Sequence, residues 1–221
     1  MEGLRAAGED VLLATPPGAP LAERAAEAGV PVLPLPVRGD LDLRAAARLA
    51  RALAGVDVLH LHTGHAHAVG LLAAALVRRP PAVVVTRRVD FPPKGALFRR
   101  WKYGRRVAAF IAISRNIERV LLAAGVSRER IHRVPSGIDP ERFRVPRDRE
   151  GLRRELAVPQ NAKLVGFIGA LVGHKAPWDL VDALARLGGE VHGVFAGAGD
   201  IEERLRHQAA SLGVAERIHF L

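Results

Sequence analysis

The chain has 221 residues, 49% of them hydrophobic, which is enough for a sizeable core in one or two domains. It contains no cysteine, so disulfides and thiolate metal sites are excluded. The formal net charge of +10 favours anionic partners, namely phosphorylated substrates, acidic lipid surfaces or nucleic acid. No apolar run approaches the ~20 residues that span a bilayer, and the first residues lack the apolar core of a signal peptide, so we expect a cytoplasmic protein.

The first part of the chain alternates short apolar runs with segments of helical spacing. The pattern predicts strands at 10–14, 32–35, 56–61, 82–85, 107–113 and 131–134, and helices at 21–28, 43–53, 69–77 and, after an N-cap at Ser114, up to residue 122. This βαβα order is typical of an α/β domain built on a parallel sheet.

A histidine cluster, HTGHAH, follows the predicted strand 56–61. His62, His65 and His67 have a spacing that could supply zinc ligands, but the cluster contains no carboxylate and the chain has no cysteine. We therefore expect no metal here and interpret these side chains as structural histidines with satisfied hydrogen bonds.

Thr86, Arg87 and Arg88 follow the strand 82–85, and the prolines beyond them predict a loop. Two adjacent arginines at a strand's carboxyl end can hold an anionic group with paired N–H donors. The alternative is a pair of arginines that faces solvent.

The segment 94–106 interleaves aromatic and basic side chains. Arg99, Arg100, Trp101 and Lys102 would suit an acidic membrane surface, because cations attract the headgroups while tryptophan settles at the boundary. Nucleic acid is the competing electrostatic interpretation. A third alternative is a solvated helix face whose aromatic side chains pack on the sheet.

Turn residues dominate the stretch VPSGIDPERF at 134–143, which predicts a domain boundary. We expect a first domain at 1–139, a linker at 140–160 that includes a charged helix at about 148–156, and a second domain at 161–221. The second domain opens on an apolar run at 163–168, as expected of a strand covered on both faces.

Gly169 follows that run, and Lys175 precedes a helix whose first turn contains Pro177. The next unit repeats the arrangement, with a buried strand at 190–196, then Gly197 and Gly199, and a helix that ends near residue 212. Ligands of open parallel sheets bind beyond the carboxyl ends of the strands, so the two loops should be neighbours and converge on one diphosphate. The alternative is a solvated loop lysine.

The segments FIGALVGHK and VFAGAGDIEERL, with the linker VPSGIDPERF, resemble the donor half and the interdomain signature of GT-B-fold, family 4-like (group 1) glycosyltransferases. The resemblance implies two Rossmann-like domains and metal-independent transfer of a sugar, with retention, from a nucleotide-diphosphate-sugar to a sugar, lipid or lipopolysaccharide-type acceptor. It implies no cofactor, a role in cell-envelope polysaccharide synthesis and a position in the cytoplasm or on the inner face of the membrane.

The resemblance also implies roles for particular residues. The donor diphosphate would be held by Gly169, Lys175, Gly197 and Gly199. The acceptor side would be lined by His62, His65, Thr86, Arg87, Arg88 and Ser114, of which His62 and Arg88 are the candidates for a catalytic role. Three positions depart from the family's pattern. Arg88 stands at about the place where relatives often carry a histidine, and Ala170 and Ala176 stand where relatives carry an arginine and a glycine.

Relatives extend beyond this sequence at both ends, with a first strand and glycine loop upstream and the other half of the donor domain downstream. We therefore expect the 221-residue chain to transfer sugar poorly. The alternative function is an incomplete or non-catalytic basic Rossmann-like module that binds anionic lipid or nucleic acid. As a glycosyltransferase it would have a nucleotide-sugar and a sugar or lipid-linked acceptor as partners, with an anionic membrane surface as a further one and no nucleic acid.

Overall fold

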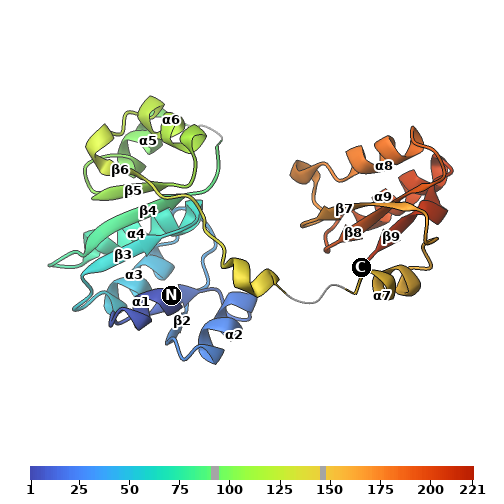
Figure 1. Ribbon diagram of the computed structural model, residues 1–221. Coiled ribbons are helices and arrows are strands. Elements are labelled where there is room, and N and C mark those ends of the chain that lie inside the picture. Colours follow the sequence, from blue (N-terminus) through green and yellow to red (C-terminus); the bar gives the residue numbers. More distant parts are fainter. Residues whose placement is uncertain (91–94, 145–147) are drawn as a thin grey trace. The chain divides into compact units, whose positions relative to one another are not determined.

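The computed structural model describes residues 1–90, 95–144 and 148–221 of the chain (Figure 1). The chain forms two compact units, Met1–Ile138 and Asp139–Leu221. All described strand pairs in both units are parallel. Within each unit, a helix or a short helical turn follows every described strand except the last, which is β6 in the first unit and β9 in the second. The predicted α/β class with two Rossmann-like units is therefore confirmed.

The first unit contains a four-stranded and a two-stranded sheet. Strands of the larger sheet lie side by side in chain order (Figure 1): β3 Val58–Leu61, β4 Ala82–Arg87, β5 Ala109–Ala112 and β6 Ile131–Arg133. The smaller sheet pairs β1 Leu13–Thr15 with β2 Val32–Pro34. Because parallel strands end at one edge, the residues after β3, β4 and β6 share that edge.

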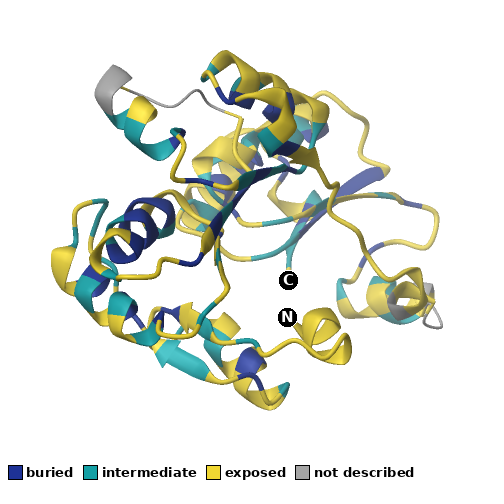
Figure 2. Cartoon of the chain, turned by 90° about the vertical axis from the view of Figure 1, so that its left-hand side faces the viewer, coloured by how far each residue is buried: buried dark blue, intermediate teal, exposed yellow. Residues whose placement is uncertain are grey.

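The helices of the first unit follow the predicted order. They are α1 Glu2–Ala6, α2 Pro20–Glu27, α3 Leu43–Ala52, α4 Gly64–Leu76, α5 Ala96–Lys102 and α6 Arg115–Ala123. Alanine, glycine and leucine occupy nearly every side of α4, and its middle is buried, so α4 packs in the interior while its neighbours keep a solvated face. Figure 2 shows buried residues along the strands and the inner helix faces, and exposed residues on the outer faces.

Two elements of the first unit differ from their predicted bounds in a way that moves functional candidates. Helix α4 begins at Gly64, because the Thr63 Oγ1 accepts a hydrogen bond from the Ala66 N–H at 3.2 Å. His65 and His67 therefore lie in the first helical turn and not in a loop. Strand β4 continues to Arg87, so the expected loop begins later.

The second unit is a three-stranded sheet in the order β7-β8-β9 with helices beside it. Its elements are α7 Arg149–Glu155, β7 Lys163–Ile168, α8 Trp178–Ala185, β8 Val191–Ala196, α9 Glu202–Ser211 and β9 Ile218–Phe220. Leu184 and Leu205 of the two long helices pack on Phe195 of the central strand. This core holds β7 and β8 in register, so the loops that follow them start at the same level.

Strand β7 has the predicted bounds, but the expectation that it is covered on both faces is wrong. Ile168 is 89% exposed and Val165 40% exposed, whereas Phe167 packs against the core. Among the described strands β7 pairs only with β8, so it is an edge strand of this sheet. An apolar run predicts a strand from local pattern alone, and coverage depends on which segments pack beside it.

No helix in the described part of the chain is long and apolar enough to cross a membrane.

Candidate functional site

The two glycine loops of the second unit run side by side. The Gly169 N–H donates to the Ala196 carbonyl at 3.0 Å, and the Leu171 N–H donates to the Ala198 carbonyl at 3.0 Å. These bonds continue the β7–β8 ladder past the strand ends. The expectation that the loops are neighbours is confirmed.

Glycine is required where these loops touch. A Cβ at Gly197 would lie 2.1 Å from the Gly169 carbonyl oxygen, and a Cβ at Gly199 would lie 2.0 Å from the Leu171 carbonyl oxygen. Gly197 also has a φ of +146°, a conformation that side-chain-bearing residues rarely adopt. Both contacts involve backbone atoms, so the loops could not move apart to admit a side chain without breaking their hydrogen bonds.

Lys175 ends a short 3-10 segment, Gly173–Lys175, directly before α8. Its side chain is exposed and, among the described residues, has neither a hydrogen bond nor an ion pair. The next residue, Ala176, has a φ of +48° in the left-handed region. The chain therefore keeps a glycine-type backbone at the position where it departs from the family's pattern, at a cost of about 1 kcal/mol.

A second group of polar side chains gathers at the carboxyl edge of the four-stranded sheet. The rings of His60 and His62 are 4.1 Å apart between centroids, and His60 Nε2 lies 2.7 Å from the Thr86 Oγ1. Arg88 reaches across the sheet edge, where its Nη1 donates to the Ser136 Oγ at 3.2 Å. The cluster His60, His62, Thr86, Arg88 and Ser136 is called the edge cluster below.

The two histidines of the edge cluster have lowered pKa values. Desolvation, the neighbouring His60 and the Arg88 guanidinium lower the pKa of His62 to about 4, with a smaller effect from the Met1 ammonium group. His62 is exposed by surface area, yet the atoms packed around its ring still desolvate it. Desolvation and Arg88 also lower the pKa of His60. Both rings are therefore neutral at pH 7.

His65 belongs to a different contact. Its Nδ1 lies 2.6 Å from the Asp40 Oδ1, and the other carboxylate oxygen accepts from the Lys102 Nζ at 2.7 Å. Lys102 also donates to the Gly64 carbonyl at 3.0 Å, and its side chain is only 12% exposed. Although burial alone would raise the pKa of Asp40, Lys102 and His65 hold it below its usual value. Lys102 thus joins α5 to the start of α4, and its assignment to an anion-binding surface is wrong.

The other members of the basic segment divide into buried and exposed residues. Trp101 is half-buried, packs against the core and touches Phe98 edge-on at 5.3 Å, so its assignment to a membrane surface is also corrected. Arg99 and Arg100 are exposed and line a hollow of about 390 Å³. Lys94 lies outside the described residues.

Arg87 and Ser114 point to structural partners. The Arg87 Nη1 donates to the Tyr103 hydroxyl, and the guanidinium also lies over that ring. The structure therefore separates Arg87 from Arg88, so the two arginines do not act as one paired site. The Ser114 Oγ accepts from the Ile117 N–H at 3.2 Å, which confirms the predicted N-cap.

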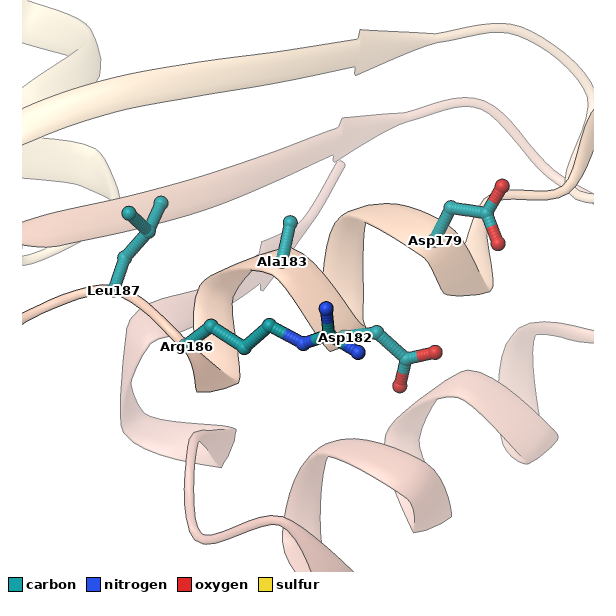
Figure 3. A pocket seen from close by; sticks show the side chains of 5 residues that line it. All are labelled: Asp179, Asp182, Ala183, Arg186 and Leu187. Carbon is teal, nitrogen blue, oxygen red and sulfur yellow. The ribbon is translucent and has the colours of Figure 1, made fainter.

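Two further features add no residue to these sites. A shallow hollow of about 460 Å³ lies along α8, and Figure 3 shows that its lining side chains come from this helix and its end: Asp179, Asp182, Ala183, Arg186 and Leu187. None of them belongs to the glycine loops. Within the described ranges, no group of three or more His, Cys, Asp or Glu residues could hold a metal ion.

Sequence reasoning missed His60, Asp40 and Ser136. The signal for His60 was available, because residues two apart on a strand share a face and His62 follows it at that spacing. Asp40 and Ser136 lie in irregular segments, 25 residues from His65 and 48 residues from Arg88 respectively. No local pattern marks such partners.

Comparison with known families gives two matches that together cover nearly the whole chain. The model of Glycosyltransferase Family 4 matches residues 1–142, and the model of Glycosyl transferases group 1 matches residues 148–221.

Curated relatives match over a shorter stretch. The D-inositol 3-phosphate glycosyltransferase of Corynebacterium jeikeium is 38% identical over 100 residues, which cover 40% of this chain and 24% of the relative. The enzyme of the same name from Corynebacterium glutamicum is 36% identical over 104 residues, 42% of this chain and 25% of the relative. The matched region thus spans about a quarter of these relatives.

Solved structures match over the whole chain. Anabaena Alr3699/HepE in complex with UDP-glucose has a TM-score of 0.85 at 22% identity, over 100% of this chain and 63% of that one. A glycosyltransferase from Rickettsia africae has a TM-score of 0.80 at 16% identity, over 100% of this chain and 62% of that one. At these identities the likeness shows the fold, which is that of GT-B glycosyltransferases.

Proposed function

Because the chain belongs to glycosyltransferase family 4, we propose that it transfers a sugar from a nucleotide-diphosphate-sugar to a sugar, lipid or lipopolysaccharide-type acceptor. The bond between the anomeric carbon and the diphosphate oxygen breaks, the acceptor hydroxyl oxygen bonds to that carbon, and its proton leaves. The transfer proceeds with retention of the anomeric configuration and without a metal ion or cofactor. The second unit binds the donor and the first unit presents the acceptor.

One observation carries this proposal: two glycine loops are joined by backbone hydrogen bonds, and the first of them leads to an exposed lysine that has no side-chain partner in the described chain. Lys175 supplies the positive charge, and the Gly173 and His174 N–H groups, which make no backbone hydrogen bond among the described residues, supply donors. Gly169, Gly197 and Gly199 bring the backbone close to the diphosphate. The N–H groups of Gly169 and Leu171 are already committed to the neighbouring loop, so they serve the loop geometry and not the ligand.

The chemical role of Lys175 follows from where charge develops. As the glycosidic bond breaks, negative charge grows on the leaving diphosphate, and a fixed cation stabilises that state more than the ground state. Lys175 and the neighbouring N–H groups perform the charge neutralisation for which other enzymes use a divalent ion. His174, which is exposed beside Lys175, would replace the contact that relatives make through the arginine at the position of Ala170.

The acceptor side is formed by the edge cluster. His62 and Arg88 face the acceptor and are the catalytic candidates, with His60 and Thr86 fixing the position of His62. His65 adds an exposed imidazole at the start of α4. Arg87 and Ser114 contribute through Tyr103 and the α6 cap and do not contact the acceptor.

The exposed pair Arg99 and Arg100 supports peripheral attachment to an acidic membrane surface. Each arginine near such a surface adds about 1 kcal/mol to binding. This attachment would bring the unit to lipid-linked acceptors used in cell-envelope synthesis, on the inner face of the membrane. As a separate function, binding of anionic lipid or nucleic acid by a non-catalytic module has no further observation in its favour.

A single-turnover assay tests the proposal. Excess protein is mixed with radiolabelled UDP-, GDP- or ADP-sugars and a set of sugar and lipid-linked acceptors, with and without EDTA. We expect labelled product whose anomeric configuration, read by NMR, matches the donor, and the same yield in EDTA. An inverted product would contradict retention, a loss in EDTA would contradict metal independence, and neither binding nor turnover of any nucleotide-sugar would contradict the function itself.

A further inference from the structure

The edge cluster has the composition of an anion site and not of a general hydroxyl-binding surface. It joins a guanidinium, two imidazoles and two hydroxyls from segments that are distant in sequence, at the edge where three parallel strands end. We propose that His60, His62, Arg88 and Ser136 form a subsite for a phosphate group carried by the acceptor. That assignment to the acceptor rests on the proposed function.

The geometry gives the subsite its shape. The Arg88 Nη1 donates one N–H to the Ser136 Oγ at 3.2 Å. The remaining N–H groups of this exposed guanidinium are available to a ligand. His60 is fixed by the Thr86 hydroxyl at 2.7 Å, and the His62 ring lies against it. These groups come from β3 and the residue after it, from the end of β4 and from the segment after β6, all at the carboxyl edge of one sheet.

The charge around the two rings is one-sided. Arg88 acts on both His60 and His62, and His62 is also affected by His60 and by the Met1 ammonium group; no carboxylate of the described chain is among these groups. In contrast, His65 only three residues further has Asp40 beside it. Desolvation, with the Arg88 cation as a further cause, keeps both imidazoles neutral. The guanidinium therefore contributes a positive charge that an incoming anion would neutralise.

A phosphate monoester fits this donor set better than a carboxylate does. A planar carboxylate offers two oxygens, which a single guanidinium already matches, whereas a phosphate offers three and carries a second charge near neutral pH. The imidazoles and the Ser136 hydroxyl would serve the remaining oxygens. A phosphorylated sugar and the phosphate of a lipid headgroup share this chemistry.

Binding should couple to proton uptake. An anion beside a histidine favours the imidazolium form, so bound phosphate raises the pKa of His60 and His62 from their lowered values. By linkage, the part of the phosphate affinity that comes from the histidines is largest below the raised pKa and is lost as pH increases through that value.

The experiment uses inorganic phosphate as the probe and the 221-residue chain. Histidine ring signals are followed by NMR in a pH titration with and without phosphate. We expect the pKa of His62 to rise by about one unit or more from about 4. The ring signal of His207, which is exposed on α9 in the other unit, serves as the internal control and should not respond.

Two arginine variants distinguish phosphate binding at the edge cluster from nonspecific attraction to the basic protein. Arg88→Gln should weaken phosphate binding at least about tenfold, the loss expected for a charged hydrogen bond. Arg51→Gln removes an exposed arginine from α3 with the same change in net charge and should bind as wild type does. Equal phosphate affinity of both variants and wild type, or a phosphate shift shared by His207, would overturn the proposal.

The source of the phosphate is read from a second set of titrations. Glucose 6-phosphate is compared with glucose, and vesicles with phosphatidylinositol 4-phosphate are compared with neutral vesicles. The source that binds tighter, in an Arg88-dependent manner, is the ligand class, and a lack of preference for both phosphorylated forms would contradict the subsite. None of these assays uses a nucleotide, so failure here leaves donor binding through Lys175 untouched, and failure of donor binding leaves the phosphate result standing.

Discussion

His67 lies in the first turn of α4 with only 4% of its surface exposed. Its ring meets Tyr103 and Phe110 edge-on, and within the described residues its Nε2 is buried without a hydrogen bond. Burial, with the nearby cation of Lys102, lowers the pKa of His67 from 6.5 to about 4. The folded chain therefore keeps this ring neutral over a range of pH where the unfolded chain would protonate it.

We predict an acid-sensitive stability that depends on His67. Below pH 6.5 the His67 ring is protonated in the unfolded state, whereas in the folded state it stays neutral down to about pH 4. The free energy of unfolding therefore falls as pH decreases through this window. Between pH 7.5 and pH 5 the loss from this residue should be about 2 kcal/mol. His67→Phe should remove that part of the pH dependence while packing in a similar volume.

The measurement is urea unfolding at both pH values. The chain has two tryptophans, Trp101 and Trp178, one in each unit, so a Trp178→Phe background makes fluorescence report on the first unit alone. If the His67→Phe variant loses as much stability between the two pH values as the chain that keeps His67, other groups cause the acid sensitivity.

The two glycine loops of the second unit hold their shape through the contact at Gly197. Gly197→Ala would place a methyl group 2.1 Å from the Gly169 carbonyl, at a φ of +146°. We expect a loss of about 1–3 kcal/mol in stability of the second unit from overpacking and backbone strain, together with weaker nucleotide binding.

Gly188→Ala is the matched control for this change. Gly188 lies in the loop after α8, and a Cβ there would meet nothing within 4 Å. Thermal unfolding followed by tryptophan fluorescence compares the two variants. Trp101 lies in the first unit and is common to both variants, so a difference between them reports on Trp178 and the second unit. If Gly197→Ala is as stable as Gly188→Ala and binds nucleotide equally well, the close contact between the loops is needed neither for stability nor for nucleotide binding.

The helix α5 retains a basic face even though part of the basic segment serves the core. Because Arg99 and Arg100 are exposed, we predict that replacing both with serine lowers binding to acidic vesicles by about 2 kcal/mol, or roughly 30-fold. Trp101 is left in place, since it packs on the core and its loss would create a cavity.

Co-sedimentation with phosphatidylserine vesicles measures this effect. The adjacent pair Arg78 and Arg79 is also exposed and provides a control with the same charge change. Vesicle binding that decreases equally in both double variants would indicate general basicity, and undiminished binding in the Arg99/Arg100 variant would remove α5 from membrane contact.

At the scale of the whole molecule, the fold follows from local pattern to a large extent. Strand β7 and the core strand β8 were predicted to within a residue, because apolar runs bounded by glycine are a strong strand signal. The neighbouring positions of the glycine loops were predicted as well, because adjacent parallel strands end at the same edge of a sheet.

Pairings between distant irregular segments could not be predicted in this way. Asp40 precedes α3 and meets Lys102 of α5 across 62 residues, so a lysine that looks like part of a basic surface is held inside an ion pair. The exposed Ile168 shows the same limit for burial. The residue type determines which interactions a side chain can make, whereas its actual partner depends on the tertiary structure.

Binding of a nucleotide diphosphate by the second unit should depend on Lys175. Lys163 offers an internal comparison, because it is an exposed lysine at the opposite end of β7 and pairs with Glu190 at 3.0 Å. Lys175→Ala removes a charge at the proposed site, and Lys163→Ala removes the same charge from the same strand's amino end.

Calorimetric titration of UDP and UDP-glucose into wild type and both variants is the most direct measurement. We predict that Lys163→Ala binds as wild type does, and that Lys175→Ala loses about 1.5–3 kcal/mol of binding free energy, about 10- to 150-fold in Kd, with unchanged thermal stability. Equal affinity of wild type and Lys175→Ala for nucleotides that do bind would contradict the proposed role of Lys175.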